Sequence, residues 1–352
     1  MKFDKRRWLR ATIGVCITAA TTIPGVSRGG VSDRQSADYE LAADVKLGEP
    51  NFWDYLTYDP KAKRVYAAHI DRVEVVDVAS GKSIGHVGPF HDVHGIAIVS
   101  ELGKGYAASG DDGVVKVFNL ADLSIVKTIK VSVDADGAVY DPIAKMVMVV
   151  AGDSKNLTLI NVADDTVAKV VPLPGKPEFL ALDGNGHVFV NIADHSAIAR
   201  VDIGSGTVSA NWPLAGCKDP HGLAYDPGSK RLFSGCANEV MVVVDAATGN
   251  NLARLPIGSR SDSVVVDSTR HRAMSANGDG TLTVVAIGAD DTYSVKRTVL
   301  TYFGGRNAAI DDSTGTLFLA HGNMKLMTGT RDLTKLRFGW DGLDVAVLKP
   351  ND

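Results

Sequence analysis

Short runs of apolar residues alternate along the chain with turn-forming residues. A repeating unit starts at a polar residue, passes through small and apolar residues to an Asp, and continues with further runs rich in β-branched residues. Seven units follow one another at spacings of 40, 42, 42, 43, 41 and 44 residues. Their first residues are Asp54, His94, Asp136, Glu178, His221, Asp262 and Arg306. Short strands in units of this length predict an all-β fold, a seven-bladed β-propeller with four strands in each blade.

An Asp stands five positions after the first residue in six of the units. These residues are Asp59, Asp141, Asp183, Asp226, Asp267 and Asp311. Three of them precede Pro, and an Asp-Pro pair is typical of a turn, because Asp caps its own turn and Pro presets φ. We therefore interpret these aspartates as structural. Third strands are expected at 73–78, 114–119, 157–161 and 241–245.

The seventh unit has no fourth strand after residues 343–348. Residues 40–47, ahead of the first unit, resemble the fourth strands of other units, such as 124–131. We therefore expect the N-terminal strand to complete the last blade, which protects the edges that an open propeller leaves unpaired. Residues 40–352 are predicted to form this single domain.

The first 27 residues have the order of an export signal. Five basic residues precede an apolar run at 11–20 that is too short for a permanent membrane anchor, and small residues follow it. We predict a signal peptide at 1–27, cut near Ser27 or alternatively near Ala20, and a flexible segment at 28–39. Arg6 and Arg7 leave the general and the twin-arginine export routes open. The mature protein is expected to be periplasmic or secreted, with no transmembrane anchor after cleavage.

The composition is that of a globular, turn-rich chain, with 45% hydrophobic residues, 22% charged residues and 36 glycines. Removal of residues 1–27 takes away five basic residues and one Asp, which changes the net charge from −4 to −8. An acidic protein is a poor partner for phosphate backbones, which argues against nucleic acid. Cys217 and Cys236 remain after cleavage, and an oxidising compartment favours a disulfide between them over two buried thiols.

Second strands end with similar residues in several units: Tyr-Ala-Ala-His at 66–69, Val-Phe-Val-Asn at 188–191 and Phe-Leu-Ala-His at 318–321. A third strand ends as Val-Val-Asp at 243–245. From about residue 40 onward the chain resembles the YVTN-repeat, YncE-like family of exported seven-bladed propellers. Asn191 and Asn277 match the asparagine of the family's motif, whereas four units replace it. The resemblance implies the fold but no settled activity: DNA binding has been proposed for one member, and others act as surface or binding proteins.

The first strand of each propeller blade lines the central channel, so the first residues of the seven units are expected to surround one opening. We call these seven side chains the mouth residues. All of them are ionisable, and like charges held close together carry a cost that a bound cation would relieve. The alternative is a solvated mouth without a ligand.

Histidines concentrate on the same face of the predicted propeller. His69, His94, His221 and His321 are candidate metal ligands, together with a carboxylate such as Glu178. Imidazole nitrogens favour Zn or Cu, and Ca is a further candidate for carboxylate oxygens. The alternative is that these histidines are surface groups that form hydrogen bonds.

The seventh unit carries an insertion at 322–342 that includes Trp340. Long loops on a rigid scaffold are usually functional or disordered, so it is either a flap over the channel or a loop packed on its blade. Asn191, Asn277 and Trp340 join the mouth residues as candidate ligand-binding residues.

No motif identifies a catalytic nucleophile. The leading hypothesis is therefore an exported binding protein whose mouth takes a small ligand, a cation or a protein or peptide segment. The alternative is a metal-dependent lyase or hydrolase in which Glu178, Asp136 or Asp262 acts as acid or base. A third hypothesis, nucleic-acid binding, rests on the family resemblance alone.

Overall fold

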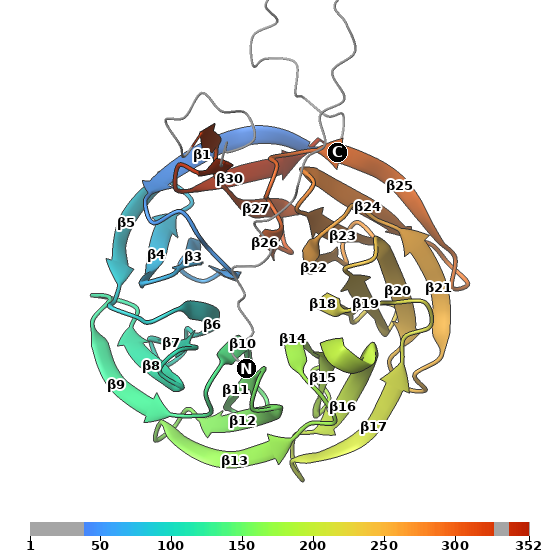
Figure 1. The fold of residues 1–352 in the computed structure, drawn as a ribbon, viewed down its shortest axis with the longest axis horizontal. Coiled ribbons are helices and arrows are strands. Elements are labelled where there is room, and N and C mark those ends of the chain that lie inside the picture. Colours follow the sequence, from blue (N-terminus) through green and yellow to red (C-terminus); the bar gives the residue numbers. More distant parts are fainter. Residues whose placement is uncertain (1–38, 327–337, 352) are drawn as a thin grey trace, which may run out of the picture. The chain divides into compact units, whose positions relative to one another are not determined.

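The structure, a computed structural model, describes residues 39–326 and 338–351. In this part of the chain seven four-stranded antiparallel sheets are arranged around a central axis, as Figure 1 shows. The predicted seven-bladed β-propeller is thereby confirmed. The predicted signal peptide and residues 28–38 lie outside the described residues. Among the described residues, no helix has the length and apolar character needed to cross a membrane.

Each blade runs from an innermost to an outermost strand. Blade 1 contains β2 (Leu56–Asp59), β3 (Arg64–His69), β4 (Arg72–Asp77) and β5 (Lys82–Val87). Blade 2 contains β6 (Val93–Val99), β7 (Lys104–Ser109), β8 (Val114–Asn119) and β9 (Ile125–Lys130). Blade 3 contains β10 (Ala135–Asp141), β11 (Met146–Ala151), β12 (Asn156–Asn161) and β13 (Thr166–Pro172). Blade 4 contains β14 (Pro177–Leu182), β15 (His187–Ile192), β16 (Ala197–Asp202) and β17 (Thr207–Pro213), with a short 3₁₀ turn, η3 (Ala193–His195).

The remaining blades follow the same order. Blade 5 contains β18 (Pro220–Asp226), β19 (Arg231–Cys236), β20 (Val240–Asp245) and β21 (Asn251–Pro256). Blade 6 contains β22 (Ser261–Asp267), β23 (Arg272–Asn277), β24 (Thr281–Ile287) and β25 (Tyr293–Leu300). Blade 7 contains β26 (Asn307–Asp311), β27 (Thr316–His321), β30 (Leu343–Pro350) and β1 (Tyr39–Gly48).

Strand β1 closes the propeller by pairing with β30. The antiparallel ladder extends from Tyr39 opposite Pro350 to Gly48 opposite Leu343. The strand from the start of the described chain is therefore the outermost strand of blade 7, as the sequence predicts (Figure 1). Both ends of the described chain are held in one sheet.

The hydrophobic core lies between the blades. Seven clusters of buried apolar side chains occur in the described residues, and each joins two neighbouring blades. Leu157 of blade 3 and Val188 of blade 4, for example, belong to the same cluster. Strands in the middle of a blade are buried on both faces, which is why β3, β11 and β19 read as nearly continuous apolar runs.

The aspartates that end the first strands hold the following turns. The Oδ1 atom of Asp59 accepts hydrogen bonds from the backbone N–H groups of Lys61 and Ala62 at 3.0 and 3.3 Å. Asp141 accepts one from the Ile143 N–H at 2.7 Å in the equivalent turn of blade 3. Their interpretation as structural residues is confirmed.

A β-bulge near the start of the innermost strand directs several mouth residues toward the axis. The register of the ladder shifts there in β6, β10, β14, β18 and β22. An extra residue in one strand bends it and re-aims its side chains. Glycine follows the mouth residue in three of these strands, and the backbone of the next blade approaches it closely: a Cβ on Gly95 would lie 2.3 Å from the Ala138 nitrogen.

Cys217 and Cys236 form the expected disulfide, which ties the loop before β18 to the end of β19. The insertion of blade 7 begins and ends as a hairpin of β28 (Met324–Leu326) and β29 (Phe338–Trp340). The indole of Trp340 lies 5.8 Å, centroid to centroid, from both Trp53 and Phe303. This hairpin base therefore packs beside Trp53, the residue before Asp54. Residues 327–337 of the insertion lie outside the described residues.

Substitution of Gly95 tests the close approach of the innermost strands. We expect Gly95→Ala to lower the free energy of unfolding by about 1–3 kcal/mol, because the new methyl group meets backbone atoms that can move only with the strand. Gly204→Ala is the matched control, since its Cβ would meet only Asp202 Oδ1, at 3.6 Å, and we expect a change within about 0.5 kcal/mol. Urea unfolding of both variants measures the difference, and equal values would contradict the packing argument.

Candidate functional site

The mouth residues of blades 1 to 3 form one half of a polar network. Nδ1 of His94 lies 2.5 Å from Asp54 Oδ2 and 4.0 Å from Asp136 Oδ1. Its other nitrogen, Nε2, lies 3.3 Å from Oδ2 of Asp92, on the outer rim. One ligand atom from each of Asp54, His94 and Asp136 can be chosen so that all three lie within 4.8 Å of one another. We call these three residues the mouth triad.

The mouth residues of blades 4 to 7 form the other half. His221 Nδ1 lies 3.3 Å from Asp262 Oδ1 and 3.6 Å from Glu178 Oε2. Asp262 also accepts a 2.8 Å hydrogen bond from Nε of Arg306. The rim carboxylate of Asp219 lies 3.4 Å from His221 Nε2, just as Asp92 lies beside His94. The two histidines thus occupy similar settings in blades 2 and 5.

Asn307 joins the two halves. Its Nδ2 group donates to Asp262 Oδ2 at 3.0 Å and to Asp54 Oδ1 at 3.4 Å. The side chain is fully buried and follows Arg306 directly in the sequence. The seven mouth residues, drawn from all seven blades, therefore belong to one connected network. Sequence reasoning did not identify Asn307, because asparagine is common at buried hydrogen-bonding positions.

Carboxylates raise the pKa of both mouth histidines. Burial disfavours the charged imidazole of His94, but Asp136, Asp54 and Asp92 outweigh it, and its pKa lies well above the ordinary 6.5. Burial likewise opposes the charged form of His221, and its carboxylate neighbours again raise the pKa well above 6.5. The mouth residues comprise four carboxyl groups, two imidazoles and one guanidinium, so acidic groups outnumber basic groups by one.

Individual carboxylates of the network differ in their environment. Burial raises the pKa of Asp54, even though His94 opposes this effect. Burial alone would also raise the pKa of Asp262, but the charges of Arg306 and His221 lower the pKa of that carboxyl below its ordinary range. Asp262 is therefore the firmly ionised group of the two.

The side chains of Tyr55 and Phe179 occupy the channel directly beneath the mouth residues. Each follows a mouth residue, and their side-chain rings lie 4.8 Å apart although they come from blades 1 and 4. Burial, followed by the four carboxylates of the mouth, raises the pKa of the Tyr55 hydroxyl well above 10. A cavity of about 560 Å³ with largely apolar walls extends along the channel from these two residues toward the opposite face. Sequence reasoning missed both residues, although they are bulky at a position where three other units have glycine.

The asparagines of the repeat motif support the fold around the mouth. Nδ2 of Asn191 donates to the backbone carbonyls of His221 and Gly222 at 2.8 and 3.1 Å, so it holds the bulge that carries His221. Asn277 donates to the hydroxyls of Thr281 and Thr283, both at 3.0 Å. The amide group of Asn191 thus links blade 4 to blade 5, and that of Asn277 is used inside blade 6.

The four histidines proposed as metal ligands occupy separate places. His94 belongs to the mouth triad, and His221 lies in the other half of the network. His69 is fully buried, with Nε2 2.5 Å from the carbonyl of Pro50. His321 lies in blade 7, where Nε2 is 2.9 Å from Asp44 Oδ1. Each candidate metal-ligand group in the described residues contains one histidine with two carboxylates.

Comparisons with known proteins support the architecture. No protein-family model matches the chain, and no curated protein is similar to it in sequence. Among solved structures, hydrazine synthase from Kuenenia stuttgartiensis has a similar fold, with a TM-score of 0.68 and 14% sequence identity over 78% of this chain and 93% of that one. Similarity at this identity shows the fold alone. The resemblance to the YVTN-repeat family stays a prediction.

The raised pKa of His221 predicts a pH dependence of stability. Between about 6.5 and the raised value, the folded protein binds a proton that the unfolded chain does not. The stabilisation from His221 is therefore complete below about pH 6.5 and is lost as the pH rises through the folded-state pKa. The slope reaches at most about 1.4 kcal/mol per pH unit for one histidine.

We expect His221→Asn to flatten the decline in unfolding free energy above pH 6.5, as measured by urea unfolding at several pH values. His86→Asn is the control, because His86 is exposed on the outermost strand β5. A slope that is unchanged in His221→Asn would show that the mouth carboxylates do not hold its proton.

Proposed function

We propose that the protein is an exported binding protein that holds a divalent metal ion in the mouth of its central channel. One observation carries this proposal: donor atoms of Asp54, His94 and Asp136 lie within 4.8 Å of one another. Two carboxylates and an imidazole suit a transition-metal ion such as Zn²⁺ better than Ca²⁺, which takes oxygen ligands.

The surroundings of the mouth triad support a bound cation. His94 and Asp136 are almost fully buried, and the acidic groups of the mouth outnumber its basic groups. The proton on His94 neutralises part of this charge, and a metal ion would take its place, since an imidazole ligand must be deprotonated. A bound ion would therefore replace an existing cationic group and would bring no uncompensated charge.

The disulfide supports the exported location, because such bonds persist in oxidising compartments outside the cytoplasm. The acidic charge of the predicted mature chain fits a cation ligand and disfavours nucleic acid.

Removal of one carboxylate of the mouth triad tests the proposal. We expect Asp136→Asn to bind one Zn²⁺ ion fewer per chain than the unchanged protein, or to bind it more than about 100-fold more weakly. Calorimetric titration and elemental analysis after dialysis measure both quantities. Asp219→Asn is the matched control, because Asp219 lies on the rim outside the triad and asparagine tolerates its positive φ of 53°. Equal zinc content in all three proteins would refute a metal ion in the mouth.

A metal-dependent lyase or hydrolase is the second candidate, and one observation favours it. His221, Glu178 and Asp262 lie in the same mouth as the triad, and His221 and Asp262 are partly exposed, so these groups could donate or accept a proton beside a bound ion. The metal ion would supply electrostatic activation of a carbonyl or of water.

This second candidate predicts that the zinc-loaded protein turns over simple esters or lactones. We expect His221→Asn to lower kcat by about 100-fold, because it removes the proton-transfer group, while the zinc content stays unchanged. Steady-state assays over a panel of such substrates measure this. If the unchanged, metal-loaded protein turns over none of these substrates, the enzyme candidate is refuted and only the binding function remains.

A further inference from the structure

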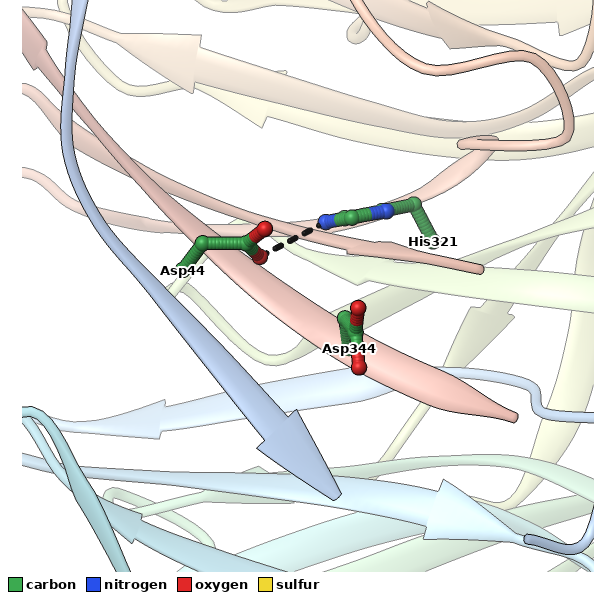
Figure 2. Close-up of side chains that lie close together, drawn as sticks. All are labelled: Asp44, His321 and Asp344. Atoms are coloured by element: carbon green, nitrogen blue, oxygen red, sulfur yellow. Dashed lines mark hydrogen bonds and ion pairs between the residues drawn. The ribbon is translucent and has the colours of Figure 1, made fainter. Parts of the chain in front are cut away.

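We infer that Asp44, His321 and Asp344 form a second divalent metal site, which fastens the N-terminal strand to the seventh blade. The three side chains come from three adjacent strands, β1, β27 and β30, and Figure 2 shows them converging. Their ligand atoms can be chosen within 4.8 Å of one another. We call this group the seam cluster, because it lies where the two ends of the described chain meet.

Strand register places these side chains together. His321 pairs with Asp344 in the ladder of β27 and β30, and Asp344 pairs with Lys46 in the ladder of β30 and β1. Asp44 stands two residues before Lys46, so it projects from the same face of the sheet, diagonal to Asp344. The cluster is thus a direct result of the closing strand pairing.

The imidazole of His321 is fixed and aimed into the cluster. It is fully buried, and the side chain of Tyr302 stacks on it with centroids 3.5 Å apart. Nε2 lies 2.9 Å from Asp44 Oδ1, as the dashed line in Figure 2 marks. Nδ1 is also buried, and it has no hydrogen-bond partner among the described residues. A side chain held this firmly needs no further ordering to bind an ion.

The two carboxyl groups of the cluster lie close to each other. Asp344 is 5% exposed, and Asp44 and Asp341 are its acidic neighbours. The amine of Lys46 approaches Asp344 only to 3.8 Å, and its side chain is 75% exposed, so water screens much of its charge. A divalent ion between Asp44 and Asp344 would relieve the repulsion of the two carboxylates.

The donor set points to a borderline transition-metal ion. One imidazole nitrogen and two carboxylate oxygens are ligands that Zn²⁺ accepts, with a further position open to water. Because the ligands come from three strands, only the closed propeller presents all of them. The ion would therefore bind the closed form selectively and stabilise it in proportion to its concentration over Kd.

Hydrogen exchange of β1 in the full chain, with Zn²⁺ as the only added ligand, tests the inference. At a zinc concentration 100 times Kd, we expect exchange of the β1 amides to slow by about 100-fold, because release of the strand then requires loss of the ion. Asp44→Asn should abolish this zinc-dependent protection. Asp44 is partly exposed, so this variant is expected to fold, and Asp344→Asn provides a second variant from another strand.

Two further variants serve as controls. Glu40→Gln removes an exposed carboxylate of the same strand outside the cluster, and it should retain the protection. Asp136→Asn removes the proposed ion of the mouth and should also retain protection of β1, so failure at one site is distinguishable from failure at the other. Two results would overturn the inference. Either zinc fails to slow hydrogen exchange of β1 in the unchanged protein, or it slows that exchange equally in Asp44→Asn.

Discussion

The antiparallel pairing of β1 with β30 is the constraint on which the rest of the structure depends. Each blade buries its apolar faces against two neighbours, so all seven interblade clusters are complete only when the circle is closed. The closing ladder joins strands from opposite ends of the described chain. Such a contact carries a large loop-closure entropy, and an extended ladder of backbone hydrogen bonds is suited to offset it.

Closure also brings the mouth residues together. Each blade contributes one polar side chain at the start of its innermost strand, and bulges and close-packed glycines such as Gly95 bring the neighbouring strands near enough for these side chains to interact. Buried carboxylates must be paired, and here His94, His221, Arg306 and Asn307 pair them. The network therefore follows from the equivalent position of one polar residue in each blade and from a bulge that repeats in blades 2 to 6.

The two metal-ligand groups share a composition but differ in their position and consequence. Each has one buried histidine between two carboxylates. The mouth triad borders the channel, where a bound ion could meet other molecules. The seam cluster lies inside blade 7 and links three strands, so a bound ion there would act on stability. Because the similarity to a solved structure shows the fold alone, the proposed function depends on these local arrangements of side chains.

The sequence by itself determined the repeat, the number of blades, the closing strand, the turn aspartates and the disulfide, because each depends on local pattern or on composition. It also identified His321 as a candidate ligand, but grouped it with His69, His94 and His221. Only the tertiary structure decided which side chains meet. Tyr55 and Phe179 touch across the axis, and Asp44 reaches His321 from the other end of the chain. The physical reason is that strand register and bulges set the direction of each side chain, and contacts between distant strands leave no local periodicity in the sequence.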